Sequence, residues 1–422
     1  MTELHPRGGE HPQVGRVTLI VGPGDRFLSG VSYYTALLTS ALAEQGPVAV
    51  LLLRRLCPRA LYPGRARVGR TDGALPLPQV PVFNGLDWFW GFSAVRAWRF
   101  WRSIRPSVVV LQWWTGTVLH SYLSMAWLAK RAGARLVIEF HELQDVGEAS
   151  LPLAGRYTRA GMQLLLRRAD AIVVHSEFDQ HELRRAYPQF AQLPIEVIQH
   201  GPYTHHVGTA QPDGRVSQRR CPTKRGGPIR VLIFGVVRPY KGHAELAAAI
   251  PILKASGLDI HLSVVGEVWQ DYRRPLKELR AALPADRLTI VDRYVADDEV
   301  PGFFSAADLI VLPYRRSSAS GPLHIAMSCG LPVVTTSVGG LVEATAGYTG
   351  AVLVSPCDPT ALAEGIRKAL PLIGITHTDP HSWRWSAQRY VSLLNRIDAD
   401  WICSAPVAES RAEEASVPVE LV

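Results

Sequence analysis

The chain has 422 residues, 47% of them hydrophobic, which is more than one typical core needs and favours two globular domains. Its five scattered cysteines lack metal-ligand spacing and exclude a disulfide-rich scaffold, so we predict a reduced cytoplasmic setting. The net charge is +8. Residues 398–422 carry six acidic residues and one arginine, a net −5, so the rest of the chain carries +13 and favours anionic partners. No zinc-knuckle, homeodomain or RNA-recognition motif accompanies this charge, so no nucleic acid partner is expected.

Short apolar runs alternate with amphipathic stretches along the chain, as in parallel α/β sheets. In the first half we predict strands at residues 17–21, 48–53, 108–111, 136–139, 171–174 and 196–198. In the second half we predict strands at residues 229–234, 259–265, 288–291, 309–312, 333–335 and 351–353. The sequence therefore predicts an α/β protein with two Rossmann-like domains, at residues 16–201 and 229–380. Residues 202–228 are predicted to be a flexible linker, residues 381–397 a closing helix, and residues 398–422 a disordered tail.

Residues 106–129 contain no acidic or basic side chain and are long enough to cross a bilayer, which takes about 20 residues. Polar residues, including Gln112, Thr115 and His120, interrupt this stretch. We therefore predict a strand, a loop and a helix over residues 117–131 instead of a membrane span. The N-terminus lacks the apolar core of a signal peptide.

Residues 93–105, SAVRAWRFWRSIR, predict an amphipathic helix. Arg96, Arg99 and Arg102 occupy one face, whereas Trp98 and Trp101 occupy the other. This pattern is typical of helices that lie in a membrane interface. It is also typical of a helix that packs on a sheet with solvated arginines. Stacking of the tryptophans on the sugar rings of a ligand is a third interpretation.

The segment FGVVRPYKGH, residues 234–243, joins a predicted strand to a predicted helix at residues 244–254. Gly235 and Gly242 suit a tight loop that carries Arg238 and Lys241. Such loops, at the carboxyl end of a parallel strand, are where open α/β sheets bind phosphorylated ligands. Two cations three residues apart suit a diphosphate. The alternative is an ordinary βα loop with surface charges.

Two further loops follow later strands. The first opens a predicted helix and contains Ser320, Gly321, Pro322 and Leu323, with Pro322 placed for the first helical turn. The second, residues 337–343, contains two glycines and ends at Glu343. All three loops lie at the same edge of the predicted sheet, and packing alone does not explain this convergence.

In chain order, FGVVRPYKG, VVGE, AADLIVLPY, SGPLHIAMSCGLPVVTT and VGGLVE resemble the C-terminal domain of family 4 glycosyltransferases. In the first half, FLSGVSYY resembles the family's first glycine loop and contains Gly30, and EFHE resembles the loop with its active-site histidine, here His141. VHSE and IQHG resemble later motifs. The resemblance spans roughly residues 16–397. It implies a retaining, nucleotide-sugar-dependent enzyme of the GT-B type, whose two domains face each other across a cleft.

The resemblance also implies roles for these residues. Arg238 and Lys241 would stabilise the leaving diphosphate, so no metal cofactor is expected. His141 would hydrogen-bond the donor sugar or steady the developing charge. The implied donor-binding residues are Gly30, Gly235, Ser320, Gly321, Pro322, Leu323 and Glu343. The implied acceptor is a glycan, a lipid-linked sugar or a small molecule, as in polysaccharide biosynthesis at the cytoplasmic face of the plasma membrane.

The sequence departs from the family pattern at two positions. Ser317 and Ile325 stand where the family usually has two glutamates, and isoleucine cannot accept hydrogen bonds from a nucleotide ribose. A nucleotide-sugar epimerase and a non-catalytic glycan- or nucleotide-binding relative remain as alternatives. His200, His205 and His206 are interpreted as a chance grouping and not as a metal site.

Overall fold

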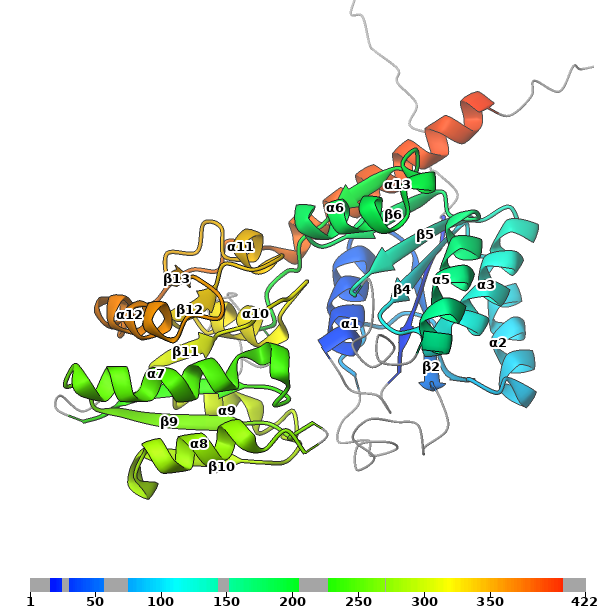
Figure 1. The fold of residues 1–422 in the computed structure, drawn as a ribbon. Coiled ribbons are helices and arrows are strands. Elements are labelled where there is room, and N and C mark those ends of the chain that lie inside the picture. The colour runs from blue at the N-terminus through cyan, green and yellow to red at the C-terminus, as the bar shows by residue number, and fades with distance from the viewer. Residues whose placement is uncertain are drawn as a thin grey trace, which may run out of the picture.

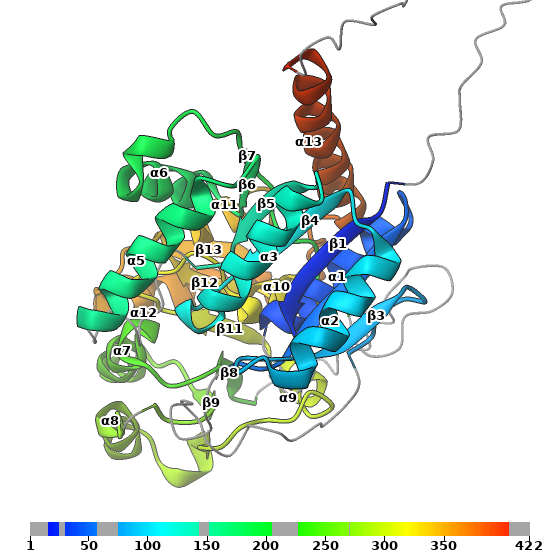
Figure 2. The ribbon, with the colours of Figure 1, turned by 90° about the vertical axis from the view of Figure 1, so that its right-hand side faces the viewer.

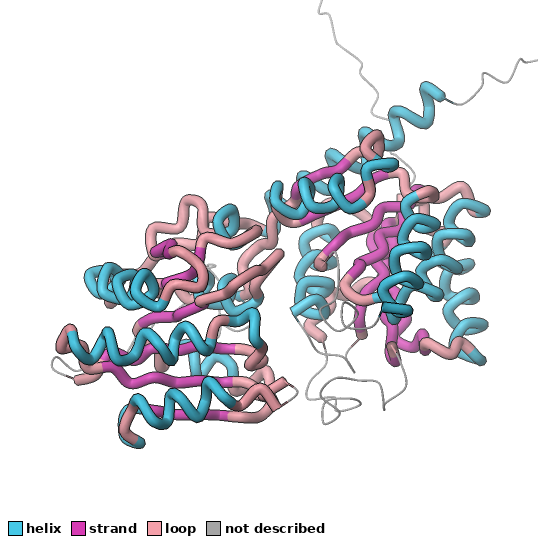
Figure 3. Tube along the Cα trace, viewed as in Figure 1, coloured by secondary structure: helices cyan, strands magenta, loops and turns pink. Residues whose placement is uncertain are grey.

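The computed structural model describes residues 16–24, 30–56, 75–142, 152–204, 227–269 and 271–404. Within these residues the chain forms two parallel α/β units that lie side by side (Figure 1). Helices cover both faces of each sheet (Figure 3). The prediction of two Rossmann-like α/β domains is confirmed by this architecture.

The first sheet contains seven parallel strands in the order β3-β2-β1-β4-β5-β6-β7. The strands are β1 (Thr18–Pro23), β2 (Val48–Arg55), β3 (Val82–Asp87), β4 (Val108–Trp113), β5 (Arg135–Phe140), β6 (Ala171–Val174) and β7 (Ile195–Val197). Six of them follow the predicted apolar runs. The sequence missed β3, because this edge strand is partly exposed, contains Asn84 and Gly85, and pairs with β2 in a broken register.

The helices around this sheet are α1 (Gly30–Ala43), α2 (Gly91–Ile104), α3 (Leu119–Arg131), α5 (Pro152–Leu166) and α6 (Glu177–Ala186), with short η3 (Gly116–Val118) and η4 (Pro188–Phe190). Alternate residues of β1 separate the two cores. Leu19 and Val21 join the core beneath α2, α3 and α5, whereas Ile20 joins the core beneath α1. This period of two is what a strand buried on both faces requires.

The second sheet has six parallel strands in the order β10-β9-β8-β11-β12-β13. They are β8 (Ile229–Phe234), β9 (Ile260–Val265), β10 (Leu288–Val291), β11 (Leu309–Leu312), β12 (Val333–Thr336) and β13 (Ala351–Val354). The surrounding helices are α7 (His243–Ala255), α8 (Arg274–Ala282), α9 (Val300–Ser305), α10 (Gly321–Ser328), α11 (Leu341–Ala344) and α12 (Pro359–Ala369), with η6 (Pro239–Lys241), η7 (Ala285–Arg287) and η8 (Leu370–Leu372).

The last helix, α13 (Trp383–Ser404), returns to the first domain. Its residues Ala387, Tyr390 and Leu393 are buried in the same core as Ile20. Figure 2 shows α13 beside the first domain. The helix continues to Ser404, beyond the predicted end at residue 397. Residues 205–226 of the predicted linker and the predicted tail beyond residue 404 lie outside the described residues.

Residues 106–129, which resembled a membrane span in composition, form β4, η3 and most of α3. Among the described residues, no helix combines the length and apolarity needed to cross a bilayer. The predicted division into strand, loop and helix is therefore confirmed.

Candidate active site

The topology of the second sheet places the predicted phosphate loop at a binding position. Its strand order reverses between β8 and β11, and open α/β sheets bind ligands at the carboxyl ends of the strands beside such a reversal. Residues 235–242 follow β8, and residues 313–320 follow β11. The two loops singled out from the sequence therefore lie at this strand reversal.

Gly235, Lys241 and Pro322 lie close together at this reversal. A Cβ built on Gly235 would lie 3.6 Å from Nζ of Lys241 and 3.7 Å from Cγ of Pro322. Nζ of Lys241 donates a hydrogen bond to the Tyr314 hydroxyl at 2.8 Å. Burial lowers the pKa of Lys241, but Tyr314 and Tyr240 outweigh this effect, and the pKa ends above its ordinary value. The lysine is therefore a fixed cation beside a backbone that a ligand can approach closely.

Arg238 is held by an aromatic residue that the sequence did not reveal. Its guanidinium carbon lies 3.9 Å from the centroid of the Trp269 ring, a cation–π contact. Its buried Nε has no hydrogen-bond partner among the described residues. Stacking fixes the plane of the guanidinium without using this donor, which suits recognition of a phosphate.

Gly242 is required by the packing of this loop. Its φ is +73°, and a Cβ at this position would lie 1.7 Å from the carbonyl oxygen of Pro313. The backbone that carries Lys241 is thereby pressed against the loop after β11. A residue with a side chain would push the two loops apart.

The loop before α10 caps that helix with its own side chain. Ser320 accepts the Leu323 N–H at 3.3 Å through its hydroxyl, and Pro322 has no N–H. The Gly321 amide has no hydrogen-bond partner within the described part of the chain. Among the predicted donor-binding residues 320–323, Gly321 and Ser320 therefore offer backbone N–H groups that no hydrogen bond of the described residues uses.

The two departures from the family pattern have different surroundings. Ile325 is 6% exposed and belongs to the apolar core beneath α10. Ser317 donates its hydroxyl to the carbonyl of Ala319 at 3.0 Å. A glutamate at position 325 would place a carboxylate in this core, so the isoleucine matches its surroundings.

Glu343, predicted to bind the donor, instead contacts the first domain in this conformation. Its two carboxylate oxygens accept the backbone N–H groups of Glu177 at 2.6 Å and Phe178 at 3.0 Å. These groups form the N-terminus of α6, where an acidic side chain is favourable. Glu343 therefore links the two domains, and a donor contact by Glu343 would compete with this link.

The first sheet contributes His141, which lies directly after β5. Its backbone N–H donates to the Trp113 carbonyl at 2.8 Å. Nearby, the fully buried Glu139 accepts hydrogen bonds from Tyr34 at 2.5 Å, from Gln112 at 3.0 Å and from Tyr390 of α13. Burial raises the pKa of Glu139, and these hydrogen bonds oppose the rise.

His141 belongs to a buried histidine cluster that also contains His175, His200 and His324. Nδ1 of His141 lies 3.1 Å from Nε2 of His175, and the ring of His200 stacks on that of His324 with centroids 4.9 Å apart. Burial lowers the pKa of His175 to about 4 and that of His324 to about 3, and it lowers the pKa of His141 and of His200 well below the ordinary value. At neutral pH the cluster is uncharged.

Gly30 opens α1 beside this cluster, and its carbonyl accepts the Tyr203 hydroxyl at 3.3 Å. A Cβ built on Gly30 meets no described atom within 4 Å. The sequence had no signal for His324. His175 and His200 do share one signal with His141: each comes at or near the end of a predicted strand.

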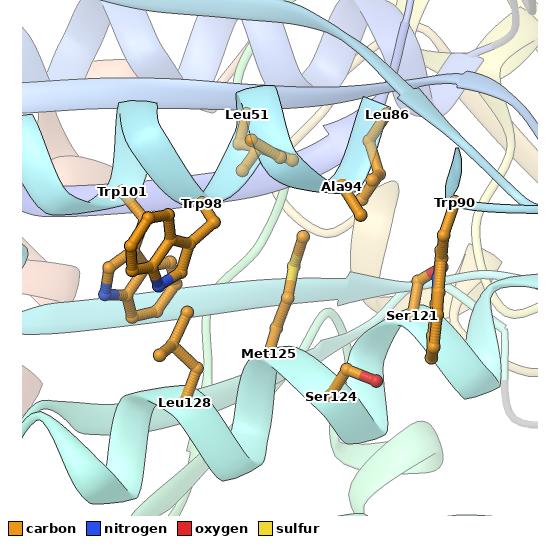
Figure 4. Close-up of a pocket in the computed structure, with 11 residues that line it drawn as sticks. Leu51, Leu86, Trp90, Ala94, Trp98, Trp101, Ser121, Ser124, Met125 and Leu128 are labelled. Atoms are coloured by element: carbon orange, nitrogen blue, oxygen red, sulfur yellow. The ribbon is translucent and has the colours of Figure 1, made fainter. Parts of the chain in front are cut away.

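Between α2 and α3 lies an apolar cavity of about 140 Å³ (Figure 4). Trp98 and Trp101 of α2 line it opposite Met125 and Leu128 of α3. Trp101 is buried in the first domain, whereas Trp98 is 45% exposed and Phe92, one turn and a half earlier, is 90% exposed. The predicted helix is confirmed, and its apolar face both packs on the domain and reaches the surface.

Two Rossmann-like domains face each other, and cations lie at the strand reversal of the second domain. This arrangement is that of the GT-B class of transferases. Residues 29–201 match the glycosyl transferase 4-like domain, and residues 228–371 match the glycosyl transferases group 1 family. The chain belongs to this family, family 4 of the glycosyltransferases, and is a glycosyltransferase. The predicted family, fold and enzyme class are therefore confirmed.

Relatives with assigned activities agree with this class. The chain is 30% identical over 301 residues to a D-inositol 3-phosphate glycosyltransferase of Salinispora arenicola. The matched region covers 66% of this chain and 67% of the relative. It is 26% identical over 285 residues to a GDP-mannose-dependent α-(1-6)-phosphatidylinositol monomannoside mannosyltransferase of Mycolicibacterium smegmatis. This matched region covers 64% of this chain and 72% of the relative.

Solved structures share the fold. Sucrose-phosphate synthase from Thermosynechococcus elongatus superimposes with a TM-score of 0.63 at 18% identity, covering 92% of this chain and 100% of that chain. The catalytic domain of starch synthase IV from Arabidopsis thaliana, bound to ADP and acarbose, superimposes with a TM-score of 0.67 at 14% identity. The superposition covers 91% of this chain and 99% of that chain.

Proposed function

We propose that this protein transfers a sugar, with retention of configuration, from a nucleoside diphosphate sugar to a glycan, lipid-linked or small-molecule acceptor. The observation that carries the proposal is the meeting of Lys241, Gly235 and Pro322 at the strand reversal of the second sheet. The relatives described above are transferases, which supports transfer and gives no support to the epimerase or to the non-catalytic alternative.

The charges suggest how the reaction proceeds. Breaking the bond between the sugar and the diphosphate places negative charge on the leaving phosphate and positive character on the sugar carbon. Lys241 and Arg238 are fixed beside the position of the diphosphate and stabilise the developing negative charge, so this step needs no metal ion. A phosphate oxygen then takes the proton of the acceptor hydroxyl as the new glycosidic bond forms on the same face. His141, on the opposite domain, is proposed to contact the donor sugar or its charge.

A ligand screen tests the donor class. We expect UDP, GDP or ADP, or one of their sugars, to raise the thermal unfolding midpoint. At 100 times its dissociation constant the correct ligand adds about 2.7 kcal/mol to the free energy of unfolding. The cognate sugar nucleotide should also be slowly hydrolysed, which a non-catalytic relative would not do. If no nucleotide stabilises the protein, the proposed donor class is wrong.

The acceptor is proposed to be reached from a membrane surface. Phe89, Phe92, Trp98 and Trp127 are exposed on α2, α3 and the turn before α2. The arginines at positions 96, 99, 102 and 105 are exposed along the same helix. Exposed aromatic rings beside a row of arginines suit the headgroup region of an anionic bilayer. A peripheral location at the cytoplasmic face of a membrane follows from this proposal.

Vesicle binding is expected to be reversible and sensitive to salt. Each basic residue near an anionic surface contributes about 1 kcal/mol, so replacing Arg96, Arg99 and Arg102 with glutamine should weaken binding roughly 10²-fold. Co-sedimentation with vesicles containing anionic lipid measures this effect, and activity on a soluble acceptor analogue should be retained.

The matched control replaces Arg274, Arg280 and Arg367 with glutamine. These arginines are exposed on α8 and α12 of the second domain. This variant loses the same net charge and should bind vesicles as the wild type does. Equal loss in both triple variants would show that total charge, and not α2, drives association. A wild type that ignores anionic vesicles at low salt would refute the membrane proposal.

A further inference from the structure

The apolar cavity between α2 and α3 is a groove that neither helix fills (Figure 4). Each helix presents one face to it, with side chains at the spacing i, i+3, i+4 and i+7. The lining residues of the two helices are Ala94, Ala97, Trp98 and Trp101 on α2, and Ser121, Ser124, Met125 and Leu128 on α3. Protein interiors are normally packed without such spaces. The alanines and serines at facing positions leave this one open.

The groove is long and narrow. Leu51 of β2 and Leu86 of β3 also line it. On the side of α2 the lining residues run from Trp90 to Trp101, which spans roughly 16 Å at the rise of a helix. A volume of about 140 Å³ spread over this length fits a single chain of methylene groups better than a sugar ring or an aromatic ring.

The two serines of the groove already have hydrogen-bond partners. The Ser121 hydroxyl accepts Nε1–H of Trp90 at 3.1 Å. The Ser124 hydroxyl donates to the carbonyl of His120 in its own helix at 3.0 Å. A sugar bound here would lose the hydrogen bonds that its hydroxyls make with water and would gain few in return. The groove therefore favours an apolar ligand over a sugar stacked on the tryptophans.

Trp90 closes one end of the groove in an unusual backbone conformation. Its φ is +60° and its ψ is −77°, which residues with a side chain disfavour. The bond to Ser121 and a ring contact with His120, with centroids 5.6 Å apart, hold the indole against α3. Backbone strain of this kind persists where surrounding contacts fix it, and it is concentrated at ligand sites.

Positive charge lies at the outer rim of the groove. Neither α2 nor α3 contains an acidic residue. The guanidinium carbon of Arg102 lies 4.8 Å from the centroid of the Trp98 ring, which lines the groove and is half exposed. On α3, the guanidinium carbon of Arg131 lies 5.1 Å from the ring centroid of the exposed Trp127. An amphiphile with its chain in the groove would therefore place its head group beside guanidinium groups, which suit a phosphate.

We propose that the groove binds one acyl chain of an anionic phospholipid, with the head-group phosphate at Arg102. The inference rests on the proposed membrane location, which supplies the lipid, and goes beyond it: α2 and α3 hold a single lipid molecule and do not only rest on a charged surface. Figure 1 shows α2 and α3 on the side of the first domain that faces away from the second domain. The lipid site is therefore separate from the site of sugar transfer.

Binding of decyl phosphate to the full chain, below its micelle concentration, tests the site by isothermal titration calorimetry. We expect one saturable site per chain. Ser124→Leu should weaken binding at least about tenfold, because the larger side chain occupies the groove. Ser103→Leu is the matched control and should bind as the wild type does. Ser103 is equally exposed and bonds a carbonyl of its own helix, but it does not line the groove.

Decanol separates the contribution of the chain from that of the head group. Arg102→Gln should weaken decyl phosphate about tenfold and leave decanol binding unchanged. Both leucine variants and Arg102→Gln should unfold near the wild-type midpoint without ligand. Equal affinity of Arg102→Gln and the wild type for decyl phosphate would overturn the assignment of the head group.

Failure of the groove and failure of the membrane proposal give different results. No saturable binding of decyl phosphate, or equal binding by Ser124→Leu and the wild type, would overturn the lipid site even if anionic vesicles bind the protein. A wild type that binds decyl phosphate but ignores anionic vesicles would refute the membrane as the source of the lipid.

Discussion

Replacing Lys241 with alanine is expected to lower turnover by roughly 10²–10³-fold, the usual effect of removing one preorganised group that stabilises developing negative charge. Lys241 is held by the Tyr314 hydroxyl at 2.8 Å and sits beside the open backbone of Gly235. Its charge is therefore in place before the diphosphate leaves, and no reorganisation is needed. Steady-state kinetics with the donor identified by the ligand screen will measure the loss.

Two controls accompany this variant. Lys254→Ala removes a lysine from the far end of α7, where Nζ donates to the Ala282 carbonyl, and should leave turnover unchanged. Tyr314→Phe keeps the Lys241 charge but loosens its position, so its loss should be smaller. Near-normal turnover of Lys241→Ala would refute the assignment of the diphosphate site. The same unfolding midpoint in all three variants would show that the fold is intact.

Replacing Gly242 with alanine is expected to destabilise the second domain by about 3 kcal/mol or more. Part of the cost comes from the φ of +73°, which side chains disfavour. The larger part comes from the Pro313 carbonyl oxygen, which would lie 1.7 Å from the new Cβ. The new Cβ is fixed to the backbone of residue 242, and the carbonyl oxygen belongs to the backbone of Pro313. Neither can move aside without displacing the loop that carries Lys241. The free energy of unfolding, measured with denaturant, and the affinity for the donor should therefore decrease together.

Gly257→Ala isolates the two contributions. Gly257 has a φ of +74°, but a Cβ built there meets no described atom within 4 Å. This variant should lose only the conformational part, about 1–2 kcal/mol, and should keep full activity. If both variants lose the same stability, the contact with Pro313 is not the cause, and the close packing of the two loops has little energetic weight.

The sequence predicted best those parts of the fold whose signal is local. The strand from Leu309 to Leu312 is a continuous apolar run, and the strand from Ile229 to Phe234 is apolar except for Arg230; the structure has both at the predicted bounds. The phosphate loop was also accessible, because Gly235, Arg238 and Lys241 lie within one short segment. β3 carries no such run, since an edge strand tolerates polar and exposed residues.

The rest of the site depends on contacts between distant residues. Glu139 bonds Tyr34 and Tyr390, which are 105 and 251 positions away. Trp269 stacks on Arg238 from the end of another strand, and nothing in the loop itself indicates this partner. Glu343 illustrates the limit of motif reasoning: its place in the loop was predicted, whereas its bond to the N-terminus of α6 depends on how the domains meet.

The return of α13 to the first domain has a consequence for the order in which the protein is assembled. Tyr390 completes the set of donors to the buried carboxylate of Glu139, and Ala387 and Leu393 cover an apolar face of the first sheet. These residues leave the ribosome after the whole second domain has been synthesised. The first domain is therefore a discontinuous unit, because its core closes only after the second domain has been synthesised. During that interval its uncovered face is available to chaperones, and an early stop codon before Trp383 would damage the domain farthest from it in sequence.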